Sequence, residues 1–289
     1  MAECISRLCR FSPSDLNPCN PIYQHSLLTD NYKLPDYPCI FTPQEKNEDQ
    51  IWLKIKQEAY FSSTNEPIMS DFYNTSILSH NSLESALANH LSIKLYNANL
   101  SKDVLYSVFL KALIESVEIQ SAVRDDLRAV KDRDPACLTY TNCLLNFKGF
   151  LACQAHRLAH KFWIQGRTVL ALLVQSRVSE AFAVDIHPGA KIGRGIVFDH
   201  ATGIVIGETA VVGDGVTILH NVTLGGTGKG DGDRHPKIGD GVVIGAWAKV
   251  LGNVRLGERS VIGAGAVVLK EVPMGATAVG NPARLVGSR

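Results

Sequence analysis

The stretch "IGDGVVIGAWAKVLGNVRLGERSVIGAGAVV", Ile238 to Val268, carries a large aliphatic residue at every sixth position. Four places after these residues stand small or β-branched ones, and a glycine often follows the aliphatic residue directly. A period of six fits neither an α-helix nor an isolated strand, whose side-chain periods are 3.6 and 2. It fits a coil with three short sides, about 18 residues per turn, in which the large residue points inward. The sequence therefore predicts a hexapeptide β-helix.

The same period continues toward the N-terminus, with one shift of two residues and one interruption. The earlier inward positions are Ile186, Ile192, Phe198 and Ile204, then, after the shift, Ile206, Val212, Ile218 and Leu224. Continuing from Leu224 would place Gly230 and Pro236 inside the coil, where neither supplies an aliphatic side chain. We therefore expect "GGTGKGDGDRHPK", residues 225–237, to leave the coil as an extruded loop, which is a common place for function.

Residues 49–182 have a helical pattern instead. In "LESALANHLSIKLYNANL" leucines recur at spacing four, and "KDVLYSVFLKALIESV" repeats this pattern. "RTVLALLVQSRVSEAF" is more uniformly apolar, which predicts a helix packed on most sides. Pro135 disfavours a helical backbone at Asp134, so a helix should end there. The predicted fold class is α+β, with a mobile leader (1–48), a helical oligomerisation domain that contributes to the substrate site (49–182) and a β-helical catalytic domain (183–289).

The composition excludes several classes of protein. A hydrophobic content of 45%, a charged content of 20% and a net charge of +1 describe an ordinary globular protein without the basic surface that nucleic acids need. The longest aliphatic run, residues 169–174, is too short for a membrane span. The seven cysteines, none of them after residue 153, form no CxxC pair and predict reduced thiols. The first 50 residues are richer in acids than organellar transit peptides, so we expect a cytoplasmic protein.

Candidate catalytic residues gather where the β-helix begins. In "FDHATG" an Asp–His pair directly follows the inward Phe198, so its two side chains cannot both point inward. With about 18 residues per coil, Asp185 lies below about residue 203, close to His200, and His200 lies below about 218, close to His220. A carboxylate that holds one imidazole nitrogen leaves the other free as a general base. We predict that role for His200, with Asp185 as its partner, and leave the role of His220 open.

A metal site is a weaker interpretation. Some β-helical carbonic anhydrases bind zinc through three histidines, two of them in a close HxxxxH pair. The histidines of the predicted β-helix stand at positions 187, 200, 220 and 235, too far apart in the sequence to form such a pair. The predicted β-helical domain also lacks cysteine ligands, so we predict no metal.

Several motifs together resemble one family. They are "VDIHPGAKIGRG", "DHATG", "IGETA", "VTLGGTGK", "GDRHPKIGDG" and "GNPARL", with "RDPAC" and "KGFLACQAHRLAHKFW" in the helical part. The sequence resembles the serine O-acetyltransferases, which are hexapeptide-repeat acyltransferases. Its motifs are most similar to those of the plant enzymes. The resemblance covers roughly residues 65–287.

The resemblance implies a fold, a reaction and partners. The β-helix would be left-handed and parallel, and trimers would pair through their helical domains into a homo-hexamer. The reaction would transfer acetyl from acetyl-CoA to the hydroxyl of L-serine, giving O-acetyl-L-serine in cysteine biosynthesis, with L-cysteine as inhibitor. His200 and Asp185 match the base and its partner. The positions that match serine-binding residues are Asp134, Asp199, Arg234 and His235, and those that match the CoA groove are Gly226, Thr227, Ala246 and Ala264.

One departure and two alternatives remain. Family members usually continue past "GNPARL" with a tail that docks into O-acetylserine sulfhydrylase, whereas this sequence stops at "VGSR". Either the chain is cut short or that partner is missing, and the sequence does not decide between them. Another hexapeptide acyltransferase, acting on a sugar or an antibiotic, would release CoA with those acceptors. A structural subunit of a cysteine-synthesis complex would assemble without turnover, and the intact His200 and Asp185 argue against it.

Overall fold

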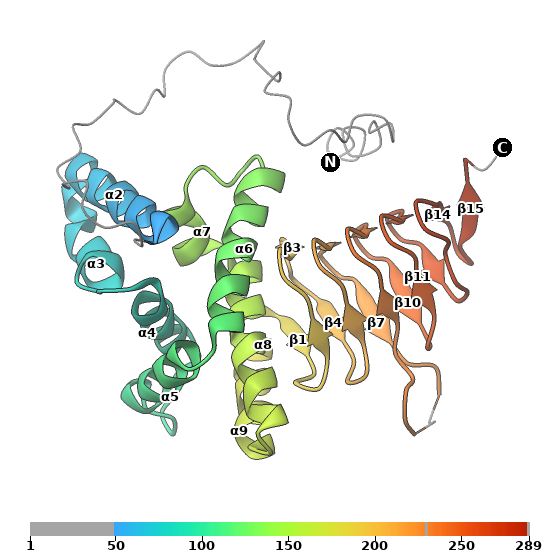
Figure 1. Ribbon diagram of the computed structural model, residues 1–289, viewed down its shortest axis with the longest axis horizontal. Helices are drawn as coiled ribbons and strands as arrows, with labels where there is room; N and C mark the ends of the chain where they lie inside the picture. Colours follow the sequence, from blue (N-terminus) through green and yellow to red (C-terminus); the bar gives the residue numbers. More distant parts are fainter. Residues whose placement is uncertain (1–48, 229–230, 288–289) are drawn as a thin grey trace, which may run out of the picture. The chain divides into compact units, whose positions relative to one another are not determined.

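The described chain consists of a helical part followed by a parallel β-helix (Figure 1). The computed structural model describes residues 49–228 and 231–287, so the predicted leader lies outside the described residues. The helices end at Phe182 and the first strand begins at Val184. The predicted fold class is confirmed.

Side chains cap the N-termini of several helices in the helical part. Ser82, Ser101, Ser116 and Thr139 each accept a hydrogen bond from a backbone N–H of the following helix, which satisfies donors that a helix start leaves unpaired. Asp134 ends α6, as predicted from Pro135. The elements are α2 (Gln50–Asn65), a 3₁₀ turn (Pro67–Met69), α3 (Ser70–Tyr73), a π turn (Asn74–Leu78), α4 (Leu83–Leu95), α5 (Lys102–Ile114), α6 (Val117–Arg133), α7 (Tyr140–Asn146), α8 (Lys148–Ile164) and α9 (Thr168–Phe182).

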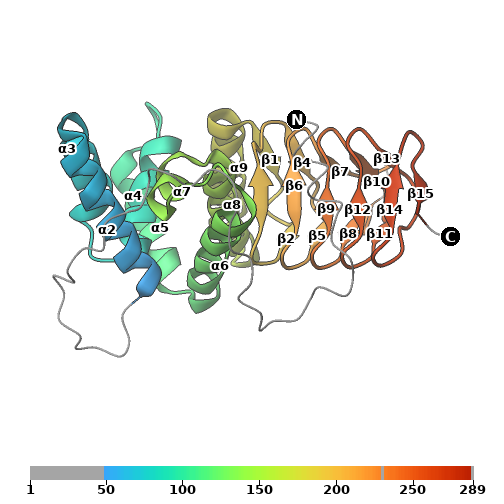
Figure 2. The same ribbon diagram turned by 90° about the horizontal axis from the view of Figure 1, so that it is seen from above.

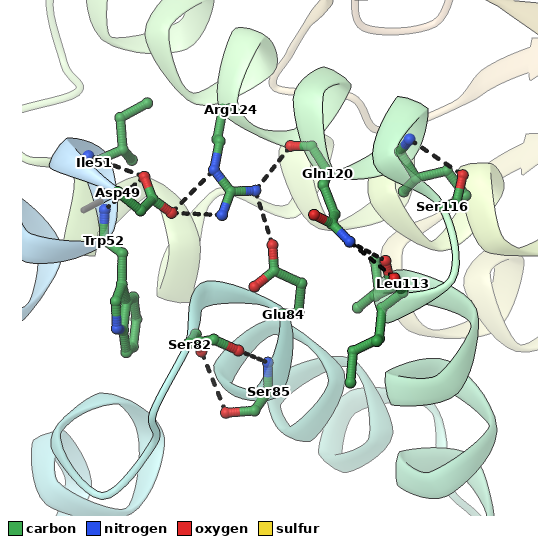
Figure 3. Close-up of polar contacts among 12 residues, drawn as sticks. Asp49, Ile51, Trp52, Ser82, Glu84, Ser85, Leu113, Ser116, Gln120 and Arg124 are labelled. Carbon is green, nitrogen blue, oxygen red and sulfur yellow. Dashed lines mark hydrogen bonds and ion pairs between the residues drawn. The ribbon is translucent and has the colours of Figure 1, made fainter. Parts of the chain in front are cut away.

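One arginine of α6 joins three helices (Figure 3). Arg124 Nε donates to Asp49 Oδ2 at 2.9 Å, and its Nη1 lies 2.8 Å from Glu84 Oε1 on α4. The other Asp49 oxygen accepts from the backbone N–H groups of Ile51 and Trp52 at the start of α2. Because these ions are largely covered, the pairs hold α2 and α4 against α6 in a defined register.

The strands form the three sides of the β-helix (Figure 2). The first side is the sheet β1-β4-β7-β10-β13, the second β2-β5-β8-β11, and the third β3-β6-β9-β12-β14-β15, in which only β14 and β15 pair antiparallel. The strands are β1 (Val184–Ile186), β2 (Lys191–Ile192), β3 (Val197–Asp199), β4 (Ile204–Ile206), β5 (Val211–Val212), β6 (Thr217–Leu219), β7 (Thr223–Gly225), β8 (Lys237–Ile238), β9 (Val243–Ile244), β10 (Lys249–Leu251), β11 (Arg255–Leu256), β12 (Val261–Ile262), β13 (Val267–Val268), β14 (Thr277–Val279) and β15 (Arg284–Val286). The predicted inward residues are buried, apart from Ile192, which is half-buried.

Two coils are longer than the sequence repeat. On the second side Val211 pairs with Lys237, and Lys237 in turn pairs with Arg255, so the earlier of these two coils contains more residues than the later one. The additional residues fall within the predicted loop, whose described parts, residues 226–228 and 231–236, protrude between β7 and β8 (Figure 1). The two ends of the prediction, Gly225 and Lys237, belong to these strands instead.

The first coil is also longer than the repeat, because Ile186 pairs with Ile206 whereas Ile206 pairs with Leu224. Asp199 pairs with Leu219, and Gly203 stands beside Asn221, so the two additional residues are His200 and Ala201. The prediction that the frame shifts after Ile204 is therefore wrong. Ile204 occupies the place of Val222 and Ala248 in later coils, and its buried aliphatic side chain resembles an inward hexad residue in the sequence.

A buried carboxylate fastens the helices to the β-helix. Asp126 on α6 is fully buried, and its Oδ2 accepts from Gln154 Nε2 at 2.9 Å and from Arg157 Nη2 at 2.7 Å, both on α8. Its Oδ1 accepts from the backbone N–H of Ile196 at 2.8 Å. Arg157 Nη2 also donates to the carbonyl of Gly193 at 2.7 Å, so this network joins two helices to the first coil.

We expect Asp126→Ala to lower the free energy of unfolding by about 3–5 kcal/mol, because it leaves the Arg157 charge buried and unpaired. Thermal melts or urea titration would measure the loss. Asp125→Ala is the matched control, since the neighbouring Asp125 pairs with Arg128 and Arg194, whose side chains are 53% and 60% exposed, and such exposed pairs contribute little. Similar losses in both variants would contradict the structural role of the buried pair.

The last helix differs from its prediction. α9 buries Ala171, Val174, Val178 and Phe182, but Val169 is 81% exposed, and Leu172 and Leu173 also face outward. The prediction of a helix packed on most sides is therefore wrong for the single chain, since α9 packs mainly against α8. No helix in residues 49–228 and 231–287 has the length and apolar character needed to cross a membrane. The three cysteines in that part of the chain are free and buried.

Candidate active site

The candidate residues occupy two different edges of the β-helix. The turns between the third and first sides, residues 199–203, 220–222, 245–248 and 263–266, form an edge that we call the histidine corner. The turns between the first and second sides, residues 187–190, 207–210, 226–228 and 231–236, form an edge that we call the arginine corner. The two corners lie at opposite ends of β4 and β7.

His200 projects from the histidine corner because of the two-residue insertion. His200 and Ala201 both have left-handed backbones, with φ of 57° and 55°. This conformation is uncommon for residues other than glycine, and histidine, asparagine and aspartate adopt it more often than most. The His200 side chain is 75% exposed, and its ring lies 5.7 Å from that of His220 in an edge-to-face arrangement. The predicted proximity of His200 and His220 is confirmed.

Two carboxylates stand beside this imidazole. Asp199 Oδ1 lies 3.8 Å from His200 Nε2, and Asp134 at the end of α6 acts electrostatically on Asp199. Burial raises the pKa of the Asp199 carboxyl, and the Asp134 charge adds to this rise, while the histidines His200 and His220 oppose it. Two half-buried carboxylates that repel each other favour an incoming cation, such as an amino-acid ammonium.

The end of α6 is held in place by its last residue. Arg133 Nη1 donates to the carbonyl of Gly215 at 2.6 Å and to Thr217 Oγ1 at 2.8 Å, and its Nη2 donates to the carbonyl of Gly195. The next residue is Asp134, whose Oδ1 accepts from the Ala136 N–H at 2.9 Å. Arg133 therefore anchors the turn that carries Asp134 to two successive coils.

The arginine corner holds the other predicted serine-binding residues. Arg234 Nη2 donates to Glu208 Oε2 at 2.7 Å, and this hydrogen bond lowers the pKa of Glu208. The backbone N–H of Thr209 donates to His235 Nδ1 at 3.2 Å, which makes this nitrogen an acceptor and leaves the ring proton of a neutral imidazole on Nε2. Burial lowers the pKa of His235, and the Arg234 charge lowers it further, so the neutral ring is favoured.

Gly207 makes room for this ring. A Cβ at residue 207 would lie 2.0 Å from His235 Nε2, so any side chain there would displace the imidazole. The loop is fastened on both sides of His235, since Arg234 N–H donates to Thr209 Oγ1 at 3.0 Å and Lys237 Nζ donates to the Thr209 carbonyl at 2.8 Å.

Asp185 does not touch His200 in the described chain. Its register partner in the next coil is Val205, and its Oδ1 accepts from Gln175 Nε2 of α9 at 2.6 Å. The expected stacking of residue 203 above Asp185 is wrong because the first coil is longer than the repeat by the inserted pair. Asp185 also opposes the fall in pKa that burial causes at His187, at the arginine corner.

The predicted CoA-binding residues divide between the same two corners. Ala246 and Ala264 lie in successive turns of the histidine corner, where the Gly265 N–H donates to the Ala246 carbonyl at 2.8 Å. Gly226 and Thr227 lie in the arginine corner, with Thr227 against Gly252. Each predicted set, for serine and for CoA, is thus split in the same way.

Sequence reasoning gave no role to several residues that shape the site. Glu208 and Thr209 lie within the motif "IGETA", which can be recognised in the sequence. Their contacts to the loop that carries Arg234 and His235 cannot be read from the sequence. Gln175 and Arg133 lie on helices with no pattern that would separate them from surface residues. In the described part of the chain, no group of three or more His, Cys, Asp or Glu side chains is arranged to hold a metal ion.

Comparisons with known proteins identify the family. The family model described as "Serine acetyltransferase, N-terminal" matches residues 51–155, and "Bacterial transferase hexapeptide (six repeats)" matches residues 235–270. Serine acetyltransferase 1, chloroplastic, of Arabidopsis thaliana is 61% identical over 246 residues, covering 85% of this chain and 78% of that protein. The chain belongs to the serine acetyltransferase family. The resemblance inferred from the motifs is confirmed, and with it the prediction of an acyltransferase.

Solved structures of this family share the fold. Soybean serine acetyltransferase complexed with serine is 58% identical, with a TM-score of 0.80 over 82% of this chain and 97% of that one. Serine acetyltransferase in complex with coenzyme A from Brucella abortus is 49% identical, with a TM-score of 0.81 over 83% of this chain and 96% of that one.

The relatives overturn the predicted location. Besides the chloroplastic relative, Serine acetyltransferase 3, mitochondrial, of Arabidopsis thaliana is 63% identical over 241 residues, covering 83% of this chain and 62% of that protein. The prediction of a cytoplasmic protein is wrong on this comparison, because it rested on the acidic residues near the start of the sequence, and relatives this similar carry organellar names.

Proposed function

We propose that this chain transfers the acetyl group of acetyl-CoA to the hydroxyl of L-serine, giving O-acetyl-L-serine and CoA, with His200 as the general base. The observation that carries the proposal is the exposed His200 imidazole on a two-residue insertion, with Asp199 and Asp134 beside it. This arrangement suits an acceptor that combines a hydroxyl with an ammonium group. The structures of relatives with serine and with coenzyme A support both substrates.

The reaction follows from these groups. His200 takes the serine hydroxyl proton as the oxygen attacks the thioester carbonyl, which a free hydroxyl does poorly. The tetrahedral intermediate then expels the CoA sulfur, and the protonated imidazole returns the proton to it, so that the base is regenerated. Asp134 and Asp199 would hold the ammonium, while Arg234 and the Nε2–H of His235 would bind the carboxylate.

These two sets of groups do not meet within one chain. β4 and its flanking residues separate the histidine corner from the arginine corner by about 13 Å, at roughly 3.3 Å per residue. The ammonium and carboxylate of serine are attached to one carbon and cannot span this distance. We therefore propose that each site combines the histidine corner of one copy with the arginine corner of a neighbour in a trimer. Pairing of trimers through their helical parts would give the hexamer.

The same contacts would accept L-cysteine. Cysteine offers the same ammonium and carboxylate with a thiol in place of the hydroxyl, so it would compete for the two carboxylates and for Arg234. We propose inhibition by L-cysteine on this basis.

A screen of acyl acceptors tests the activity. Thiol release from acetyl-CoA is expected only when L-serine is added, and free L-cysteine, corrected for its own thiol, is expected to raise the apparent KM for serine. Equal release with sugar or antibiotic acceptors would favour a different hexapeptide acyltransferase.

The affinity for serine should depend on pH through Asp199. Its carboxylate must be charged to bind an ammonium, and its pKa is raised by burial and by Asp134, so protonation begins at a higher pH than for an ordinary aspartate. We expect the KM for serine to rise as the pH falls through this raised pKa. The KM of Asp199→Asn, which cannot titrate, should be higher and lose this part of the pH dependence. An unchanged pH profile in that variant would refute the assignment.

A further inference from the structure

One residue of the histidine corner has a side chain that its backbone disfavours. Four successive turns place a left-handed residue at the same point: Gly203, Asn221, Trp247 and Gly265, with φ of 75°, 56°, 66° and 70°. Glycine adopts this conformation without strain, and asparagine tolerates it, but a large side chain makes it costly. A strained residue at a functional edge is a reason to look for a function.

The Trp247 indole is also available to a ligand. The residue is 60% exposed, although it is the largest type of apolar side chain. Its backbone N–H donates to the His220 carbonyl at 3.0 Å, while the indole N–H makes no hydrogen bond within the described part of the chain. Single exposed apolar residues are common, so exposure alone would say little. Exposure, strain and position together point to a contact outside this chain.

Trp247 lies on the same corner as His200, two turns further along the β-helix. The turn that carries it follows the His220 turn, which follows the His200 turn, so Trp247 is about two coil spacings, roughly 10 Å, from His200. On the other side of His200 the corner is covered by α8, whose Lys148 contacts Thr202. Gly149 of α8 packs so closely that a Cβ there would lie 2.0 Å from the Phe198 carbonyl oxygen.

Later coils extend away from α8, so an elongated ligand that lies along the histidine corner runs in their direction (Figure 1). A thioester that reaches His200 along this corner therefore passes Trp247.

We propose that the Trp247 indole packs against the pantetheine arm of acetyl-CoA and raises the affinity for the acyl donor; this inference rests on the proposed function. The arm begins at the reacting sulfur, so the segment roughly 10 Å from His200, two coil spacings away, is its amide and dimethyl region rather than the nucleotide. An indole face covers planar amides and methyl groups well, and its N–H offers a donor to an amide carbonyl. This contact would compensate for the strain in the backbone.

Two glycine variants separate a ligand contact from backbone strain. Trp247→Gly should raise the melting temperature by relieving strain, and it should also raise the KM for acetyl-CoA about 5- to 10-fold. The kcat and the KM for serine should stay within about twofold. Arg259→Gly is the matched control, because Arg259 has a φ of 56° in the turns between the second and third sides, away from the histidine corner. It should raise the melting temperature and leave every KM unchanged.

Binding without turnover gives a second readout. CoA should change the tryptophan fluorescence of the wild-type protein, largely through Trp247, because Trp52 is buried and Trp163 is half-buried. The change should be lost in Trp247→Gly, and Trp247→Phe should keep most of the CoA affinity. Adenosine 3′,5′-bisphosphate, the nucleotide half alone, should bind wild type and Trp247→Gly equally well.

Each alternative result has a defined meaning. An unchanged KM and Kd in Trp247→Gly, with a raised melting temperature, would overturn the proposal, since the residue would then be merely tolerated. Loss of the oligomer by light scattering would also overturn it and make Trp247 an interface residue. Weaker binding of adenosine 3′,5′-bisphosphate to Trp247→Gly would place the nucleotide at the indole and overturn the assignment to the arm. Wild-type protein without serine-dependent turnover, but with CoA binding that depends on Trp247, would support the contact and reject the proposed function.

Discussion

Replacing His200 by asparagine is expected to lower the kcat for serine acetylation about 10²- to 10⁴-fold, the usual contribution of a general base. Asparagine tolerates the left-handed backbone that residue 200 requires, so the variant removes the base without adding strain. The KM for acetyl-CoA should change little, because the imidazole acts on the acceptor. Steady-state kinetics with thiol detection would measure both constants.

Two further variants test which groups serve the base. His220→Asn should cost less than His200→Asn, because the His220 ring is half-buried and its Nδ1 is covered, whereas His200 is exposed to the acceptor. Asp185→Asn should lower kcat if Asp185 orients His200, as the family resemblance implies. An unchanged kcat in Asp185→Asn would leave Asp199, which is paired with His200 in this chain, as the orienting carboxylate. A larger loss in His220→Asn than in His200→Asn would refute the choice of base.

The sequence predicts the β-helix well because its constraint is local and repeated. Each inward hexad position must fill the same narrow interior, so aliphatic residues recur wherever the coil continues, and Gly230 and Pro236 mark where it stops. The inserted pair at His200 is harder to locate. Ile204 is buried like a hexad residue, so the apolar pattern permits the shift on either side of it.

The sequence indicated which residues gather at the site better than it indicated which side chains touch one another. The proximity of His200 and His220 follows from stacking alone, because consecutive turns lie above one another. Predicting the contact of Asp185 required the length of the first coil. A coil of 18 residues places residue 203 beside Asp185, whereas the insertion of His200 and Ala201 places Val205 there. The contacts of Arg133 and Gln175 depend on how helices pack on the coils, which no short-range pattern records. Trp247 can be noticed in the sequence, because it stands where the next coil has Gly265, a residue that suits the left-handed backbone of this turn.

Mixing two inactive variants should restore activity if each site combines two chains. His200→Asn damages the histidine corner, and Arg234→Ala damages the arginine corner, so each alone should be nearly inactive at moderate serine concentrations. In randomly mixed trimers, half of the histidine corners and half of the arginine corners are intact. About a quarter of the sites should then combine two intact corners. Co-expression with two different affinity tags, followed by purification on both, would isolate the mixed oligomers for assay.

The matched control mixes two variants of the same corner. His200→Asn with Asp199→Asn should give no recovery, because every site built from those chains contains one damaged histidine corner. Recovery in the first mixture and not in the second would require that serine be held by groups from two chains. No recovery in either mixture, with mixed oligomers present, would mean that one chain completes its own site. The loop that carries Arg234 would then have to move about 13 Å along the first side of its own β-helix, a distance that its fastening to Thr209 and Glu208 opposes.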